Sequence, residues 1–288
     1  MQDINRPDGI LKLIKPVKLA AFLCFFIVSM VFAQLLFEIF TKGFASISMS
    51  WFFENPEMGG RNGGIASILV STLTITIICL FFAIPIALLS AIFLCECANS
   101  QSTSINIVHG ALDLLASIPS IVFGLFGYSF FVIYLDMGFS ILAGGLTLSL
   151  MILPLLIRLF KDGFVNVPDA YRLNALASGL SIFTTYIKVI IPIAKKNLVT
   201  AIILSIGRAF SETAALIYTA GYVYRMPESI LDSGRTLSVH ILDLAMNVPG
   251  GTQNSYGSAL TLLLILLLIN LLILSSTKSR YNETGIIP

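Results

Sequence analysis

An arginine and a glutamate stand close together inside an otherwise uncharged apolar stretch. Arg208 and Glu212 interrupt the run of residues 197–222. Placing one Arg at the centre of a membrane helix costs roughly 2.5–3.5 kcal/mol on insertion scales, so such a residue requires a structural or functional reason. The spacing of four residues predicts that both side chains lie on one face of a helix, where they can form an ion pair.

Two hypotheses account for this pair, and the spacing alone does not separate them. In the first, Arg208 and Glu212 neutralise each other and brace a helix bundle. In the second, Arg208 binds an oxyanion, because a guanidinium binds phosphate-like groups through two parallel hydrogen bonds. Glu212 would then hold Arg208 when no anion is present, or accept a hydrogen bond from a protonated phosphate. Ser205, Ser211 and Thr213 add hydroxyl groups nearby, although hydroxyls in membrane helices most often bond their own backbone.

A second candidate site precedes this run, in the polar segment of residues 161–196. Pro168 and Asp169 form a helix start signal, and apolar residues follow at i, i+3, i+4 and i+7 spacing, namely Leu173, Leu176, Ala177 and Leu180. Gly179 suits the left-handed position after a helix, and Ser181 would cap a second helix that ends or bends at Pro192. Such a helix pair either lies in the membrane interface or docks in a groove of a soluble partner, and its small apolar face favours docking.

The elements that must position these residues are membrane helices. The 288 residues are 57% hydrophobic and 11% charged, against about 25% charged residues in soluble domains. We therefore predict an all-α membrane protein, since no stretch alternates like a barrel strand. Six segments are long and apolar enough to span a bilayer: residues 17–40, 65–94, 113–136, 138–157, 197–222 and 258–277. They form one domain of residues 17–277, between an N-terminal tail of residues 1–16 and a C-terminal tail of residues 278–288.

The basic residues predict the orientation of these spans. Twelve of the 17 Lys and Arg residues fall in the segments on one side, four fall on the other side, and Arg208 lies within a span. By the positive-inside rule, both termini are cytoplasmic. The excess of basic over acidic residues is only +2, which argues against a nucleic-acid partner. The four Cys and two His residues lack the spacing of a metal site, so we expect no metal or cofactor.

The segment of residues 161–196 resembles the cytoplasmic E-A-A-x3-G-x9-I-x-L-P signature of ABC importer permeases, whose short coupling helix rests in a cleft of the ATPase. Aligned on Gly179, residues 173–175 replace E-A-A and residues 189–192 replace I-x-L-P. Leu173 and Asn174 depart from the signature and remove its glutamate without changing the helix geometry. The resemblance implies a set of ATPase-coupling residues: Asp169, Arg172, Leu173, Ala175, Leu176, Ala177, Ser178, Gly179 and Pro192.

Longer stretches resemble the permeases of the phosphate-specific transport (Pst) family. GRAFSETAAL is similar to the family's G-R-x-x-G-E-T-A stretch, with Ser211 in place of the usual glycine. LASIPSIVFGLFG and LAGGLTLSLMILPLLIR resemble its third and fourth spans, and the short N-terminus and NVPGG are closer to the PstA than to the PstC type. The resemblance implies a six-span importer fold of type I in the cell inner membrane. It also implies a phosphate path past Arg208, Ser211, Glu212 and Thr213.

The same resemblance implies several partners. These are a second, PstC-like permease, two PstB-like ATPase subunits and an external PstS-like phosphate-binding protein. ATP would be bound by the ATPases, because this chain lacks the G-x-x-x-x-G-K-S/T loop, and we expect the chain itself not to be an enzyme. Two alternatives stay open: an importer of another oxyanion such as sulfate or molybdate, and a secondary transporter. A secondary transporter would often show an internal repeat, and none is evident here.

Overall fold

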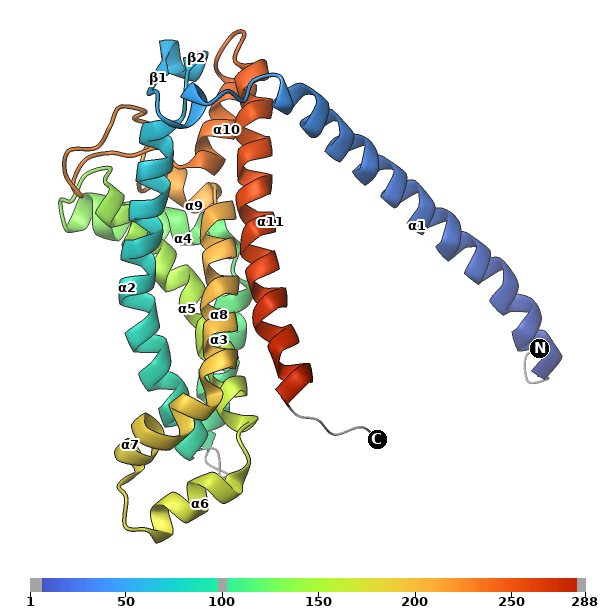
Figure 1. Ribbon diagram of the computed structural model, residues 1–288, viewed down its shortest axis with the longest axis vertical. Helices are drawn as coiled ribbons and strands as arrows, with labels where there is room; N and C mark the ends of the chain where they lie inside the picture. Colours follow the sequence, from blue (N-terminus) through green and yellow to red (C-terminus); the bar gives the residue numbers. More distant parts are fainter. Residues whose placement is uncertain (1–6, 98–102, 284–288) are drawn as a thin grey trace.

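Long helices dominate the computed structural model, which describes residues 7–97 and 103–283 (Figure 1). The outermost residues of the two predicted tails, 1–6 and 284–288, lie outside the described residues. Five helical segments within the described part are long and apolar enough to cross a membrane. They are formed by α1 (Pro7–Phe44), α2 (Ala66–Cys97), α5 (Ile141–Val165), α8 (Ile191–Ser211) with the turns before it, and α11 (Thr252–Glu283).

The predicted third span is broken into two parts. Helix α3 (Thr103–Ser117) and helix α4 (Ser120–Gly127), which the π-helix η3 (Tyr128–Tyr134) extends, meet at an angle of 94°. Pro119 stands at the break, where it removes a backbone donor and disfavours helical geometry at the residue before it. The predicted span of residues 113–136 therefore contains a sharp break at Pro119, and the spans number six if this bent pair counts as one.

The predicted fifth span, residues 197–222, begins 15 residues too late and ends 11 residues too late compared with the helical path 182–211. The helical path begins at Ile182 with α7 (Ile182–Thr185), continues through the π-helix η4 (Tyr186–Ile190) and ends with α8 at Ser211. Of the two outcomes predicted at Pro192, an end or a bend, the helix does not end there. Pro192 occupies the first turn of α8, directly after the π-helix η4. Only the short helix α9 (Ala214–Ile217) continues the predicted run.

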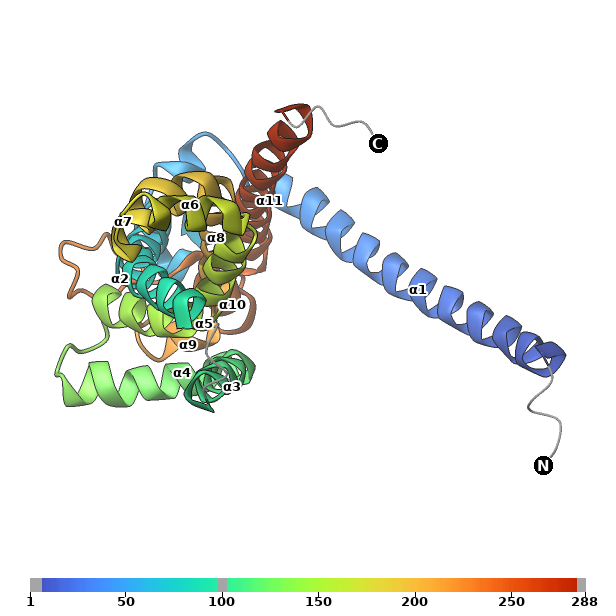
Figure 2. The ribbon, with the colours of Figure 1, turned by 90° about the horizontal axis from the view of Figure 1, so that it is seen from below.

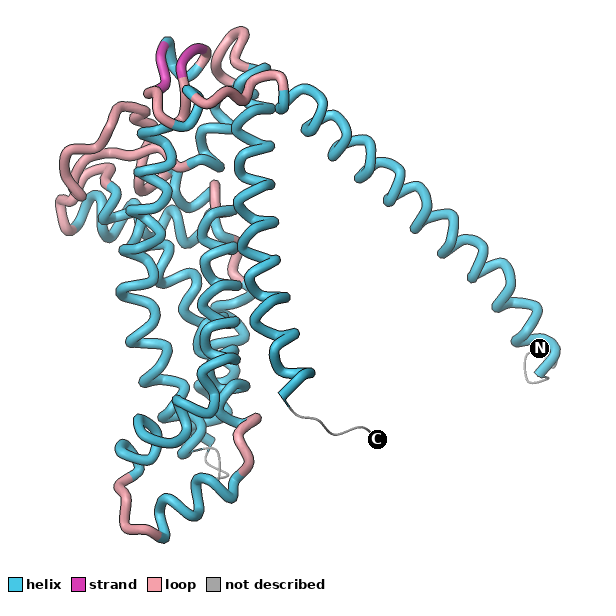
Figure 3. The backbone as a smooth tube through the Cα atoms, viewed as in Figure 1, coloured by secondary structure: helices cyan, strands magenta, loops and turns pink. Residues whose placement is uncertain are grey.

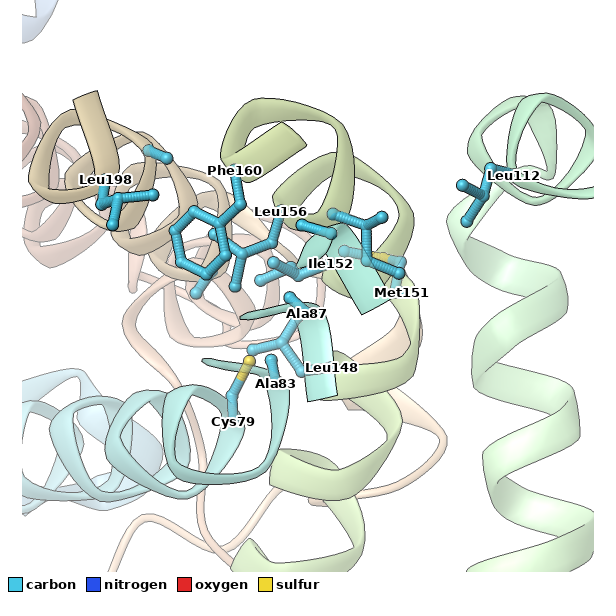
Figure 4. Close-up of a cluster of buried hydrophobic side chains, with 14 of the residues drawn as sticks. Cys79, Ala83, Ala87, Leu112, Leu148, Met151, Ile152, Leu156, Phe160 and Leu198 are labelled. Atoms are coloured by element: carbon cyan, nitrogen blue, oxygen red, sulfur yellow. The ribbon is translucent and has the colours of Figure 1, made fainter. Parts of the chain in front are cut away.

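Helices α2 and α5 form the centre of the bundle. Small residues recur every fourth position on α2, at Cys79, Ala83, Ala87 and Ala91, and all four are fully buried. Figure 4 shows this stripe facing the larger side chains of α5, among them Leu148. Small residues let membrane helices approach closely, so van der Waals packing replaces the hydrophobic effect that holds a soluble core together.

Helix α1 stands away from the bundle (Figures 1 and 2). Its apolar window is 0% buried within the chain, and it meets the body mainly at α11. Gly43 marks the closest approach, because a Cβ added there would lie 2.7 Å from the carbonyl oxygen of Tyr256. The first span therefore presents nearly its whole surface to its surroundings.

Loops and short elements close one end of the bundle, and two short helices close the other (Figure 3). The first end holds η1 (Ser50–Phe52), the strand β1 (Pro56–Glu57), η2 (Met58–Gly60), the strand β2 (Asn62–Gly63) and helix α10 (Leu237–Met246). The strands are antiparallel, with Pro56 opposite Gly63. Apolar residues recur at helical spacing from Leu237 to Ala245, and helix α10 forms there and packs on the spans. The opposite end holds α6 (Asp169–Ala177) and α7.

We expect Gly145→Ala to destabilise the protein. A Cβ at Gly145 would lie 2.5 Å from Ile78 Cγ2 and 3.2 Å from the Ile75 carbonyl oxygen, so α2 and α5 must separate. Overpacking of this kind costs about 1–3 kcal/mol. The matched control is Gly110→Ala in α3, where a Cβ meets nothing within 4 Å and improves helix propensity. Thermal unfolding in detergent should show a lower Tm for the first variant alone. Equal Tm values would contradict the close packing of these two helices.

Candidate functional site

Arg208 is the centre of the candidate site. It lies in the last turn of α8, and its exposed side chain lines two cavities, of 380 and 240 Å³. Within the part of the chain that the structure describes, the guanidinium makes no hydrogen bond or ion pair. The charge of Arg208 is thus available to a group outside the described residues.

Glu212 does not form the ion pair that the spacing predicted. Helix α8 ends at Ser211, and Glu212 adopts an extended conformation with φ −76° and ψ 129°. Its side chain Oε1 accepts a hydrogen bond from the Ala215 backbone N–H at 3.3 Å, at the start of α9. Ser238 of α10 donates its hydroxyl to the Glu212 carbonyl oxygen, which satisfies a backbone group that the broken helix leaves free. The brace hypothesis is therefore wrong for this structure.

The 380 Å³ cavity nevertheless brings Arg208 and Glu212 together. Ser211 also lines it, and the opposite wall comes from α11, where Asn270 adds an amide. Ser211 donates its hydroxyl to the Gly207 carbonyl oxygen at 2.9 Å, and Ser205 bonds Ala201 in the same way, as expected for hydroxyls in membrane helices. Thr213 lies outside the lining of both cavities, so three of the four predicted path residues share one site.

The 240 Å³ cavity adds a residue that the sequence analysis missed. Arg158 of α5 lines it together with Arg208. The sequence placed Arg158 at the end of a span, where it counted only toward the orientation of the chain. No local pattern links it to Arg208, which lies fifty residues away.

The predicted coupling residues lie together on α6 and the turn after it, apart from Pro192 at the start of α8. Gly179 has φ +81°, its N–H bonds the Leu176 carbonyl oxygen at 2.9 Å, and Leu180 N–H bonds that of Ala175 at 3.2 Å. This pair of bonds is the Schellman motif, so the left-handed glycine predicted after the helix is confirmed. Ser181 caps α7 as predicted, with its hydroxyl accepting from Thr184 N–H at 3.2 Å.

Most side chains of helix α6 are exposed. Ala175 is its buried residue, whereas Leu173 is 63% exposed and Leu176 is 39% exposed. Asp169, Ala177, Ser178 and Gly179 are exposed as well. Of the predicted apolar stripe, Leu173, Leu176 and Ala177 are therefore exposed, and Leu180 is half-buried.

Arg172 ties α6 to the spans. Its Nε lies 3.6 Å from Glu96 Oε1 at the end of α2, and its Nη2 donates to the Tyr186 hydroxyl at 3.2 Å. Tyr186 is fully buried and stacks edge-on against Phe164 of α5. One side chain thus connects the exposed helix to α2, to η4 and, through Tyr186, to α5.

A buried charge cluster fixes α10 at the other end of the bundle. Arg235 is 5% exposed, and its Nη1 lies 2.9 Å from Asp243 Oδ2. Its Nε donates to the Tyr222 carbonyl oxygen at 2.8 Å, and His240 Nδ1 lies 3.4 Å from its Nη1. Ser238 of the same helix bonds the Glu212 backbone, so the cluster that fixes α10 also positions Glu212 at the wall of the Arg208 cavity. The sequence analysis assigned no role to Arg235 or His240.

Comparisons with known proteins agree with this architecture. The family described as "Binding-protein-dependent transport system inner membrane component" matches residues 83–278. The "Probable ABC transporter permease protein YqgI" of Bacillus subtilis (strain 168) is 28% identical over 264 residues, which cover 86% of this chain and 90% of that protein. The "Phosphate transport system permease protein PstA 2" of Mycobacterium bovis is 33% identical over 222 residues, covering 76% and 73%.

A solved structure shares the fold. It is that of a bacterial ABC transporter involved in the import of the acidic polysaccharide alginate, with a TM-score of 0.62 over 94% of this chain and 99% of that chain. At 12% identity the likeness concerns the fold alone. The predicted all-α fold of an ABC importer permease is therefore confirmed.

We expect acid to destabilise the folded protein through His240. Burial, and secondarily the nearby Arg235 charge, lower the pKa of His240 from 6.5 to about 3. Between pH 6.5 and about 3, His240 is protonated in the unfolded chain and neutral in the folded protein. The stability contribution is thus complete above pH 6.5 and falls as the pH drops toward 3, by up to about 1.4 kcal/mol per pH unit. Thermal unfolding from about pH 7.5 to about pH 5 should give a steeper loss for the natural protein than for His240→Gln. Parallel pH profiles would refute the assignment.

Proposed function

The chain belongs to the family of binding-protein-dependent transport system inner membrane components, and we propose that it is a transmembrane permease subunit of an ATP-driven phosphate importer. The relative from Mycobacterium bovis that bears a phosphate-transport name covers about three-quarters of the chain. Arg208 is the main reason for proposing an anion as the substrate. It is a permanently charged side chain in a membrane span, it lines two cavities, and it lacks a partner among the described residues.

Phosphate would bind where Arg208 and Glu212 face the 380 Å³ cavity. The Arg208 guanidinium would donate two parallel hydrogen bonds to phosphate oxygens. The Glu212 carboxylate, which lines the same cavity without touching Arg208, would accept a hydrogen bond from the P–OH group. Sulfate carries no such proton at neutral pH, so the carboxylate would disfavour it. Ser211 would contribute at most through its backbone, because its hydroxyl already bonds Gly207.

The remaining subunits would complete the path and supply the energy. A second, PstC-like permease would close the open side of the Arg208 cavity, and a PstS-like binding protein would deliver phosphate at the end that carries α10. Two PstB-like ATPases would bind ATP and grip α6, whose exposed Leu173 and Leu176 suit docking in a groove. Movement of α6 would reach the spans through Arg172. In this arrangement the chain lies in the cell inner membrane with both termini in the cytoplasm.

We expect Arg208→Gln to abolish phosphate uptake by vesicles that contain the full complex, while the complex still assembles. Removing one partner of a desolvated charge pair costs roughly 2–5 kcal/mol, so uptake should fall by roughly 30-fold or more. The matched control is Arg225→Gln in an exposed loop, which should transport normally. Unchanged uptake in Arg208→Gln would leave this side chain without a transport role.

The same vesicles identify the anion. An excess of arsenate should compete with labelled phosphate, because it has the same shape and protonation, whereas an excess of sulfate should not compete. Strong competition by sulfate would instead favour an importer of oxyanions in general.

We expect Gly179→Val to loosen the ATPase subunits. Gly179 has φ +81° and open space around its Cα, so the substitution acts through backbone strain of about 1–2 kcal/mol at the end of α6 rather than through a clash. Gly138→Val is the matched control, since Gly138 has φ +62°, similar open space and a position far from α6. Co-purification should show less ATPase with the first variant than with the second. Stoichiometric ATPase in both variants would argue against docking at α6.

A further inference from the structure

Two arginines from different helices share one small cavity. Arg158 reaches the 240 Å³ cavity from α5, and Arg208 reaches it from α8. The rest of the lining is apolar and comes from α3, α4, α5 and the break between α3 and α4. Two like charges against an apolar wall repel each other more strongly than they would in water, so the cavity favours a negatively charged occupant.

Arg158 has a partner that it can exchange. It forms an ion pair with Asp113 of α3, and the side chains of the two residues are 41% and 69% exposed. This pair is therefore not sealed inside the chain, and Arg158 lines the cavity while it is paired. An anion that binds Arg158 and Arg208 together can reach Arg158 there and take the place of Asp113.

The break in the third span supplies a second argument. Ile118, between α3 and α4, lines the cavity, and non-helical backbone at membrane depth is tolerated only where protein or a water-filled cavity covers it. Val122 N–H donates to the Pro119 carbonyl oxygen at 3.0 Å, and helix geometry gives the other N–H groups of the first turn of α4 no acceptor within that helix. The backbone here is thus compatible with a hydrated or anion-filled space.

We propose that Arg158 and Arg208 form a second binding site for a tetrahedral oxyanion, in which Arg158 exchanges Asp113 for the anion. Arg208 lines both cavities and so is shared between this site and the 380 Å³ cavity. Arg158 lies about two turns from the end of α5 that leads to α6, so an anion that moves from the larger to the smaller cavity approaches the coupling end. The identification of that anion as phosphate rests on the proposed function. A lipid phosphate group has the same recognition chemistry and is the other possible source.

The test compares Arg158→Gln with Asp113→Asn in the full complex. If Arg158 binds the anion, Arg158→Gln should lower the uptake of labelled phosphate by roughly tenfold or more, since a charge-assisted hydrogen bond is lost. Asp113→Asn should leave uptake unchanged or faster, because it removes only the competitor for Arg158. If Arg158 merely braces α3 against α5, both substitutions break the same ion pair and should impair uptake equally. That result would overturn the proposal.

Direct binding provides the second readout. Equilibrium binding of inorganic phosphate to the purified complex should be weakened by Arg158→Gln and by Arg208→Gln. The double variant should lose less than the sum of the two effects, because both side chains bind one anion. Independent, additive losses would contradict a shared site. Normal uptake in Arg158→Gln together with lost uptake in Arg208→Gln would overturn this second site and leave the proposed function intact.

Lipid composition separates the two sources of the anion. The uptake measurements are repeated in vesicles of phosphatidylcholine alone and in vesicles with added phosphatidylglycerol. A defect of Arg158→Gln in both membranes supports a site for transported phosphate. A defect that appears only with phosphatidylglycerol assigns the cavity to a lipid headgroup and overturns the transit role.

Discussion

A fixed positive charge inside a membrane-spanning helix must contact water, an anion or a counter-charge, and the centre of this protein is arranged around that requirement. Arg208 meets it with two cavities rather than with a carboxylate of its own chain. The interruption of α8 after Ser211 belongs to the same arrangement, because it turns Glu212 toward α9 while keeping it at the wall of the larger cavity. Backbone that leaves the helix at this depth remains satisfied through Ser238.

Side-chain charges tie the short helices to the spans at both ends of the bundle. Arg172 connects α6 to Glu96 and Tyr186 at one end, and Arg235 connects α10 to Asp243 at the other. The Arg235–Asp243 pair is buried, and breaking a buried ion pair costs several kcal/mol because one charge remains without a partner. Arg208, by contrast, has no ionic partner among the described residues, and the partner of Arg158 is an exposed Asp113. This arrangement agrees with the proposed function, in which α6 and α10 contact partner subunits and the Arg208 site binds the transported anion.

Local chemistry explains which features the sequence could predict. The length of the apolar stretches indicates the spans, and the spacing of apolar residues indicates α10. Gly179 and Ser181 correctly predict the turn between α6 and α7. These features depend on residues a few positions apart. The end of α8 depends instead on Ser238 in a distant helix, and the site role of Arg158 depends on how α5 packs beside α8. Residues 197–222 were predicted as one helix from their hydrophobicity. Hydrophobicity gives no information on the end of α8 at Ser211, where the backbone hydrogen bonds change partners.

Helix α1 adds a property of a different kind. Its apolar stretch of 28 residues is about 42 Å long, whereas the hydrocarbon core of a bilayer is about 30 Å thick, so the helix must lean. Since its far end touches no other described helix, a change of inclination breaks few contacts within the chain. Helix α1 can therefore adjust its inclination to bilayers of different thickness without breaking the contacts of the bundle.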